Sequence, residues 1–306
     1  MKHLVLAVMV VVMSSCAVTS HGAQPAKLGV TRSTADLVAS LAEPGVVELE
    51  TVNSADWLVE RSGLINLANP VAKDAGLVEG EEPIQVYFHV LRHPTKGTFL
   101  VDTGVETALR DAPAKSAMSG LVRSAMHLEK LTVHVPLGEW LAKEGQVDGV
   151  LLTHLHLDHI TGMADVPKGT PVFTGPGESK DSQLMYLFVQ GSADRALEGK
   201  PALQEWQFQP DATGTFDGVL DVFGDGSVWA LSVPGHTPGS TAYLVRSKAG
   251  PVLLTGDACH TRWGWEHHVE PGTFTGDGPR GAESFKKLQG FVAAHPEVEV
   301  RLGHQR

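Results

Sequence analysis

The sequence has 306 residues, of which 42% are hydrophobic, and a formal net charge of −11 at pH 7. This length and hydrophobic content are enough for a sizeable core, and no low-complexity segment divides the chain, so we expect one domain over 24–306. The acidic charge argues against nucleic acid as a partner, because its phosphates would be repelled.

The first 17 residues are typical of an export signal. Lys2 gives a basic start, residues 4–13 are continuously apolar, and small residues follow. This run is too short to span a membrane and predicts a secretory signal over 1–17. The segment Met-Ser-Ser-Cys at 13–16 resembles a lipobox that leads to lipidation of Cys16, with Met in place of the usual Leu. Ordinary cleavage after Ala17 is the alternative. We expect an exported protein, either periplasmic or a membrane-anchored lipoprotein.

Helix-like and strand-like segments alternate along the rest of the chain. Apolar spacing predicts helices near 34–42, 137–144, 181–189 and 282–294. β-rich runs predict strands near 85–92, 97–102, 147–153, 170–174, 228–233, 241–246, 251–255 and 297–302. Such alternation is typical of an α/β architecture.

Two connections, 105–146 and 175–226, are longer than simple links between strands need. Their apolar residues would either line a substrate pocket or pack in the core, and the sequence does not assign a binding role to any one of them. They are Met118, Leu121, Met126, Leu131, Leu184, Met185, Tyr186, Leu187, Phe188 and Trp206.

A cluster of three histidines and one aspartate follows the apolar run 147–153. His154 and His156 share one side of an extended chain, and Asp158 and His159 come directly after them. Imidazole and carboxylate groups are suitable ligands for zinc and similar divalent metals. A single ion could not readily use all four groups and keep an open position, so the cluster indicates two ions if other residues contribute.

Three further strand-like runs end in the same way, each with a His or Asp beside glycine. They lead to His236, Asp257 and His304. Glycine allows the sharp turns and close backbone approaches that such a site needs. One such residue is usually an ordinary turn residue, but four strand ends that meet at one sheet edge would form a metal pocket.

The ordered set of residues resembles the metallo-β-lactamase-fold hydrolase superfamily. It comprises His154-x-His156-x-Asp158-His159, His236, Asp257 and His304, with supporting context in 99–104 and 235–240. Within the superfamily it is similar to the N-acyl-homoserine lactonases and the methyl-parathion-hydrolase-like enzymes. The resemblance implies a four-layer αββα sandwich. True β-lactamases usually carry Cys where Asp257 stands, which argues against antibiotic hydrolysis.

The resemblance also implies a ligand set and a reaction. His154, His156 and His236 would hold one ion, Asp158, His159 and His304 the other, and Asp257 would bridge them. The ions would be Zn²⁺, with Fe, Mn or Co as alternatives, and would supply a metal-bridging hydroxide. The implied function is a dinuclear hydrolase acting on lactones or other small esters. Organophosphate triesters are an alternative, and a non-catalytic metal-binding surface protein is the alternative of another class.

One position departs from the lactonase pattern. Lactonases of this group commonly carry Tyr three residues after the bridging aspartate, where this chain has His260. An imidazole there could donate a hydrogen bond or act as a general acid, so Asp158, Asp257 and His260 are the candidate catalytic residues. Trp263 and Trp265 would either form an aromatic wall for the substrate or cap the core. We expect Cys259 to be structural, and the sequence leaves the oligomeric state open.

Overall fold

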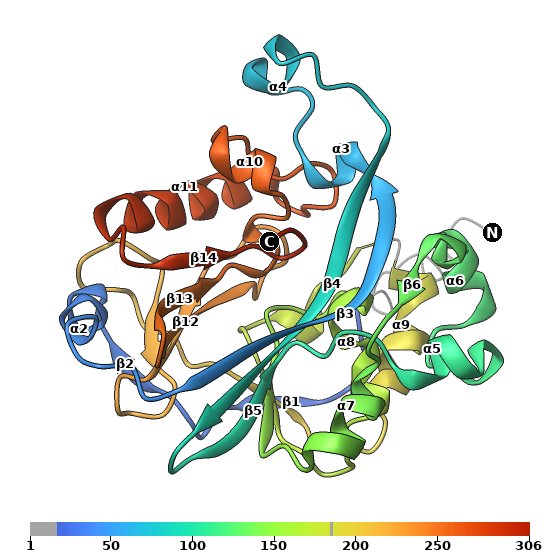
Figure 1. The fold of residues 1–306 in the computed structure, drawn as a ribbon, viewed down its shortest axis with the longest axis horizontal. Coiled ribbons are helices and arrows are strands. Elements are labelled where there is room, and N and C mark those ends of the chain that lie inside the picture. Colours follow the sequence, from blue (N-terminus) through green and yellow to red (C-terminus); the bar gives the residue numbers. More distant parts are fainter. Residues whose placement is uncertain (1–16, 184–185) are drawn as a thin grey trace, which may run out of the picture.

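Alternate side chains of one central strand point into two different cores. On β12 (Thr241–Ser247), Tyr243 and Val245 pack between two β-sheets, whereas Ala242 and Leu244 pack toward helices on the outside. Because successive side chains point to opposite faces, a strand whose side chains are all buried needs another layer of structure packed on each face of its sheet. The computed structural model, which describes residues 17–183 and 186–306, accordingly has two sheets face to face with helices on their outer faces (Figure 1). The predicted αββα sandwich is confirmed.

The first sheet has eight strands in the order β1-β9-β8-β7-β5-β4-β3-β6. In this order, neighbouring strands from β1 through β9, β8 and β7 to β5 are parallel. Neighbouring strands from β5 through β4 and β3 to β6 are antiparallel. The strands are β1 (Ala23–Pro25), β3 (Glu48–Glu60), β4 (Glu81–His93), β5 (Gly97–Val101), β6 (Thr132–Val133), β7 (Gly149–Leu151), β8 (Val172–Thr174) and β9 (Leu203–Glu205).

The second sheet has six strands in the order β14-β13-β12-β11-β10-β2. Only the pair β13 and β14 is parallel among these described strands, so β11, β13 and β14 all run in one direction. The strands are β2 (Val30–Arg32), β10 (Val219–Asp221), β11 (Val228–Ser232), β12, β13 (Gly250–Leu254) and β14 (Glu299–Arg301).

Helices cover the outer face of each sheet. Leu288 of α11 (Gly278–Ala294) and Leu37 of α2 (Thr34–Ser40) pack on the second sheet. Leu137 of α7 (Leu137–Glu144) and Ala193 of α9 (Tyr186–Ala196) pack on the first. The two helix layers lie on opposite sides of the molecule in Figure 1. Shorter helices are α3 (Arg61–Leu64), α4 (Pro70–Asp74), α5 (Thr107–Asp111), α6 (Gly120–Ala125), α8 (Leu157–Ile160) and α10 (Arg262–Glu266).

Each predicted strand and helix has a counterpart in the structure, with differences at the ends. The helix predicted near 181–189 corresponds to α9, but its predicted start is wrong, because 181–183 are not helical and Ser182 instead pairs with Ala17 in a β-bridge. Leu184 and Met185 lie outside the described residues. Residues 1–16 of the predicted signal, including Cys16, also lie outside them. The long strand β3 was not predicted from the sequence.

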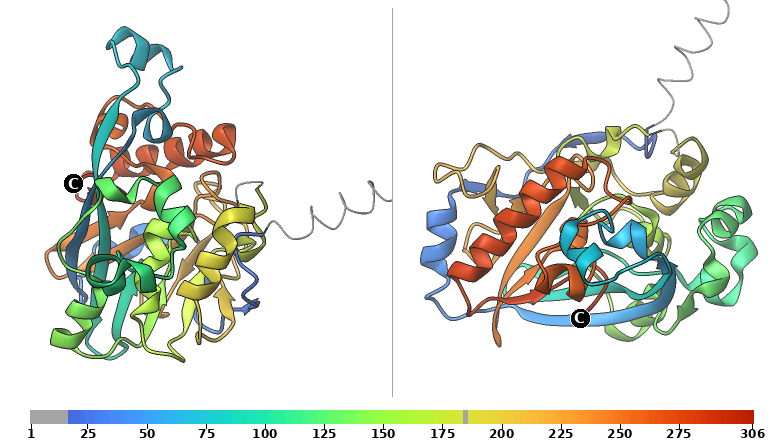
Figure 2. Two further views of the ribbon diagram at one scale, coloured as in Figure 1. Left: turned by 90° about the vertical axis from the view of Figure 1, so that its right-hand side faces the viewer. Right: turned by 90° about the horizontal axis from the view of Figure 1, so that it is seen from above.

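Strands β3 and β4 form a long twisted ribbon that extends beyond the body of the molecule. The segment between them carries α3 and α4 and projects as an arm (Figures 1 and 2). A β-bulge at Ser54 interrupts their pairing, and the hydroxyl of Ser54 accepts a hydrogen bond from the Val105 amide. Among the described helices, none is long and apolar enough to cross a membrane.

Candidate metal centre

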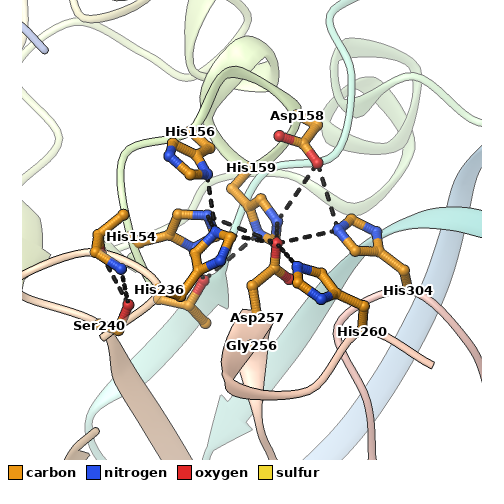
Figure 3. A network of polar contacts seen from close by, with 12 residues as sticks. His154, His156, Asp158, His159, His236, Ser240, Gly256, Asp257, His260 and His304 are labelled. Carbon is orange, nitrogen blue, oxygen red and sulfur yellow. Dashed lines mark hydrogen bonds and ion pairs between the residues drawn. The ribbon is translucent and has the colours of Figure 1, made fainter. Parts of the chain in front are cut away.

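The sequence-predicted ligands come from the segments that follow four strands, of which β11, β13 and β14 run in one direction. The chain leaves β7 into a loop with His154 and His156, and α8 then carries Asp158 and His159. Loops after β11, β13 and β14 bring in the remaining side chains, and all seven meet at one edge of the sandwich (Figure 3). They are His154, His156, Asp158, His159, His236, Asp257 and His304.

His154, His156 and His236 form the first group. Nε2 of His236 lies 3.2 Å from Nε2 of His154 and 2.9 Å from Nδ1 of His156. Burial lowers the pKa of all three imidazoles, that of His154 and of His236 well below the usual range. Three neutral imidazoles that turn ring nitrogens toward one another suit a cation, because ligation needs the neutral form.

Asp158, His159, Asp257 and His304 form the second group. Asp257 Oδ2 lies 3.4 Å from His159 Nε2 and 3.3 Å from His304 Nε2, and Asp158 Oδ2 lies 3.6 and 3.4 Å from the same two nitrogens. Ligands held at normal zinc distances around a tetrahedral ion are about 3.4 Å apart. The spacing within this group therefore fits a divalent ion.

Asp257 lies between the two groups. Its Oδ2 is also 3.8 Å from His154 Nε2 and 3.5 Å from His236 Nε2. Burial alone would raise the pKa of Asp257, but His304, His159 and His260 hold it well below its usual value. A Cβ atom on Gly303 would collide with this carboxylate, so the glycine permits the close approach. A carboxylate kept ionised between two ligand groups can bridge two ions.

The second group favours positive charge. Burial would lower the pKa of His159 and His304, but the surrounding carboxylates, Asp257 first, outweigh it and raise both pKa values. His159 Nε2 and Asp257 Oδ1 are fully buried and have no hydrogen-bond partner among the described residues. Buried polar atoms without partners are costly. A divalent cation would supply both the missing partner and the missing charge.

The outer nitrogens of several ligands are held by fixed partners. His304 Nδ1 donates to the carbonyl oxygen of Gln85 at 2.8 Å, and His159 Nδ1 lies 2.8 Å from Asp102 Oδ2. Asp102 Oδ1 and Oδ2 also accept hydrogen bonds from the amide and hydroxyl of Thr153. Such contacts fix the ring orientation and leave the inner nitrogen free to bind metal. Asp102 lies in the segment 99–104, which the sequence resemblance includes as context for the ligand pattern, and its contacts support the metal-binding loops.

Glu178 connects two ligand loops, and sequence reasoning missed it. Its carboxylate accepts from the Leu155 amide at 2.9 Å, from the Thr237 hydroxyl at 2.8 Å and from the Gly239 amide at 2.9 Å. Leu155 is between His154 and His156, and Thr237 follows His236. Burial raises the pKa of Glu178 to about 7. One buried side chain therefore sets the spacing of the two loops that form the first group.

Five of the seven predicted ligands line a cavity of about 1090 Å³, namely His156, Asp158, His236, Asp257 and His304. Its apolar wall includes Trp57, Met126, Tyr186 and other side chains. Its exposed rim includes Glu60, Glu79, Glu81 and Lys130, and Lys130 pairs with Glu81. Trp57 was not singled out in the sequence, because no local pattern links the β3 ribbon to the metal loops. Of the apolar residues named in the two long connections, the described ones that line the cavity are Met126 and Tyr186.

The two tryptophans after Asp257 do not form the cavity wall. Trp265 packs edge-on against Phe285, and Trp263 stacks on His267, and neither is among the described lining residues. Of the two interpretations open from the sequence, the structure favours packing at the edge of the core. Cys259 is also structural, since it is 1% exposed and burial raises the pKa of its thiol to about 12.

Comparison with known proteins agrees with this geometry. The family model described as "Metallo-beta-lactamase superfamily" matches residues 82–286. N-acyl homoserine lactonase AttM of Rhizobium radiobacter is 34% identical over 161 residues, which cover 51% of this chain and 57% of that protein. The matched segment therefore spans little more than half of that relative's length.

Solved structures share the fold at low sequence identity. A variant of AiiA from B. thuringiensis with N-decanoyl-L-homoserine bound superposes with a TM-score of 0.60 and 19% identity, over 85% of this chain and 94% of that one. AidC, a dizinc quorum-quenching lactonase, superposes with a TM-score of 0.58 and 15% identity, over 91% of each chain.

Proposed function

Because this chain belongs to the metallo-beta-lactamase superfamily, we propose that it is a dinuclear metal-dependent hydrolase of lactones or other small esters. The observation that carries the proposal is the convergence of seven histidine and aspartate side chains in two groups, with Asp257 of the second group also within 4 Å of the first, beside a cavity that five of them line. The likeness to AttM supports lactones as the first substrates to test.

Two divalent ions, zinc by preference, would supply Lewis acidity and a water of lowered pKa in this site. The chain's own residues arrange that chemistry. Burial keeps His154 and His236 neutral and ready to bind, and Asp102 fixes the ring of His159. The cavity wall around Trp57 and Met126 would hold the apolar part of a substrate against the metal groups.

The charges around the cavity favour an uncharged substrate. Glu60, Glu79 and Glu81 lie at its rim with one lysine, Lys130, which pairs with Glu81, so Glu60 and Glu79 leave an acidic excess there. The chain as a whole carries a net charge of −11. Acidic groups at an entrance lower the local concentration of anions. Lactones, carboxylic esters and organophosphate triesters are neutral, whereas phosphodiesters are anionic, so the rim favours the first three. Triesters remain the alternative substrate class.

The test is a metal analysis combined with a substrate panel. Purified protein should contain about two divalent ions per chain, and lactones should be hydrolysed faster than aryl esters, phosphotriesters, phosphodiesters or a β-lactam. A chain with only trace metal, or with activity unchanged after chelation, would overturn the proposal. Two bound ions without turnover of any substrate would favour the non-catalytic metal-binding protein.

We also propose that the protein is exported and anchored through Cys16. The apolar run at 4–13 supports export. Contacts of Ala17 and Val18 with the domain support a mature chain that keeps Ala17, as cleavage before Cys16 would leave it. Val18 is buried and its amide donates to the Asp181 carbonyl, and Gln190 donates to the Ala17 carbonyl. Mass spectrometry of the mature protein should find a lipid on Cys16. An unlipidated chain that starts at Val18 and is free in the soluble fraction would select ordinary cleavage.

A further inference from the structure

His260 is a buried histidine whose side chain has no hydrogen-bond partner among the described residues. It is 1% exposed, and both of its ring nitrogens are unpartnered. It follows Asp257 by three residues, just after the short turn at 256–258. A buried imidazole needs at least one partner to offset its lost hydration. The position of the ring indicates what that partner is.

The ring takes the same position relative to Asp257 as the predicted ligands do. His260 Nε2 lies 3.3 Å from Asp257 Oδ2, as His304 Nε2 does, and the two rings are parallel with centroids 5.8 Å apart. On its other side, His260 meets His236 edge-on at 5.2 Å (Figure 3). Ligand atoms of His236, Asp257 and His260 all lie within 4.8 Å of one another.

We propose that His260 is an additional metal ligand, which joins His236 and Asp257 on the ion of the first group. This inference rests on the proposed function, because it requires the metal centre. Nε2 of His260 faces the Asp257 oxygen without forming a hydrogen bond to it, as two ligands of one ion do. Imidazole is a preferred ligand of zinc.

The assignment makes the two ions unequal. The first would have His154, His156, His236, His260 and the shared Asp257, whereas the second would have Asp158, His159, His304 and the shared Asp257. Zinc in proteins accepts four or five ligands, so both sets are chemically acceptable. The second set would then have one protein ligand fewer than the first. If His260 were instead only the hydrogen-bond donor predicted from the sequence, its removal would leave both ions in place.

The experiment compares metal retention in the full-length parent, His260→Ala and His260→Phe. The Phe variant keeps a ring beside His304 but has no nitrogen to bind metal. Each protein is loaded with zinc, titrated with a chelator and analysed for remaining metal. A second sample is loaded with cobalt and its visible absorption spectrum recorded. His268→Ala, an exposed histidine on the same connection, serves as the matched control, and thermal unfolding checks that each variant is folded.

We expect both His260 variants to lose one ion at a chelator concentration at least about tenfold lower than the parent needs, since even an outer partner of a ligand contributes about 10–100-fold to affinity. Their cobalt spectra should change, and those of His268→Ala should not. Parent-like chelation curves or parent-like cobalt spectra in folded His260 variants would overturn the assignment. A parent that binds no stoichiometric metal would instead overturn the proposed function itself.

Discussion

Asp102 Oδ2 and His159 Nδ1 lie 2.8 Å apart, so a carboxylate from the end of β5 orients a histidine of the second group. Asp102 adopts a positive φ of 55° to make this contact. Non-glycine residues are seldom held in that conformation, and where they are, function often explains it. The strained backbone places both carboxylate oxygens against Thr153 and His159.

Asp102→Asn should therefore weaken metal binding while the fold is retained. The amide can no longer accept at both oxygens, and the contacts with His159 and Thr153 become mismatched. We expect metal affinity to fall about 10–100-fold, measured by chelator titration with elemental analysis. Asp148→Asn is a suitable control. Asp148 accepts a hydrogen bond from the Thr98 amide at the start of β5, whereas Asp102 follows the other end of that strand. Equal effects of both substitutions would argue against the orienting role.

Asp257→Ala should abolish hydrolysis, because among the described residues it removes the one carboxylate that lies within 4 Å of ligands in both groups. Asp158→Ala should mainly deplete the second group, since Asp158 contacts only His159 and His304 among the described ligands. Metal analysis and turnover of the best substrate check both variants. Near-normal turnover of Asp257→Ala would contradict the dinuclear arrangement.

Glu178→Gln should loosen the two loops of the first group. Both carboxylate oxygens of Glu178 accept hydrogen bonds, and Gln replaces one of them with an NH₂ group that can only donate. A donor in the neighbouring loop then loses its acceptor, and a buried donor left unpaired costs about 1–3 kcal/mol. Glu106→Gln is the matched control, because Glu106 is equally buried and accepts from Ser116 and Ala117 away from the ligands. Chemical unfolding should detect a loss of stability in both variants. Only Glu178→Gln should also lower metal affinity, and equal metal affinity in the two variants would contradict the positioning role.

His89 should make the fold sensitive to mild acid. Burial, with a further contribution from Arg301, lowers its pKa to about 3. Arg301 donates to the Thr51 hydroxyl, which lies 2.8 Å from His89 Nδ1 and can donate to its neutral form. Below the unfolded pKa of about 6.5, the unfolded chain takes up a proton that the folded chain does not. Stability should therefore fall as pH decreases from 6.5 toward 3.

The test compares the free energy of unfolding at pH 7 and pH 5 in the parent and in His89→Asn. Asn keeps a polar atom near the position of Nδ1 but has no proton to gain. Between these pH values the parent should lose about 2 kcal/mol more than the variant. His134→Asn, at an exposed histidine, should behave as the parent does. A parallel decline in parent and His89→Asn would show that other groups cause the acid sensitivity.

The sequence predicted the layers and the ligands better than the surroundings of the site. His154, His236, Asp257 and His304 each follow a recognisable β-rich run, so a local pattern is enough to place them at strand ends. Glu178 is different, because its partners lie 23, 59 and 61 residues away in the chain. Contacts of this kind depend on tertiary packing and leave no periodic trace.

The missed strand β3 has a related cause. Its side chains are mostly half-buried and do not alternate, and Asn53 and Ser54 interrupt the run at the bulge. Its extended form follows from pairing with β4 over almost its whole length rather than from its own composition. The cavity wall at Trp57 was invisible in the sequence for the same reason, since this residue reaches the site only through that pairing.

The ligands follow strands of both sheets, and they are spread over 154–304 of the sequence. His154 to His159 belong to the first sheet, and His236, Asp257 and His304 belong to the second. No segment of the unfolded chain holds a complete set, so a preformed site arises only when the sheets pack together. Metal uptake should therefore be the last step of maturation, and each bound ion would act as a cross-link that slows separation of the two halves.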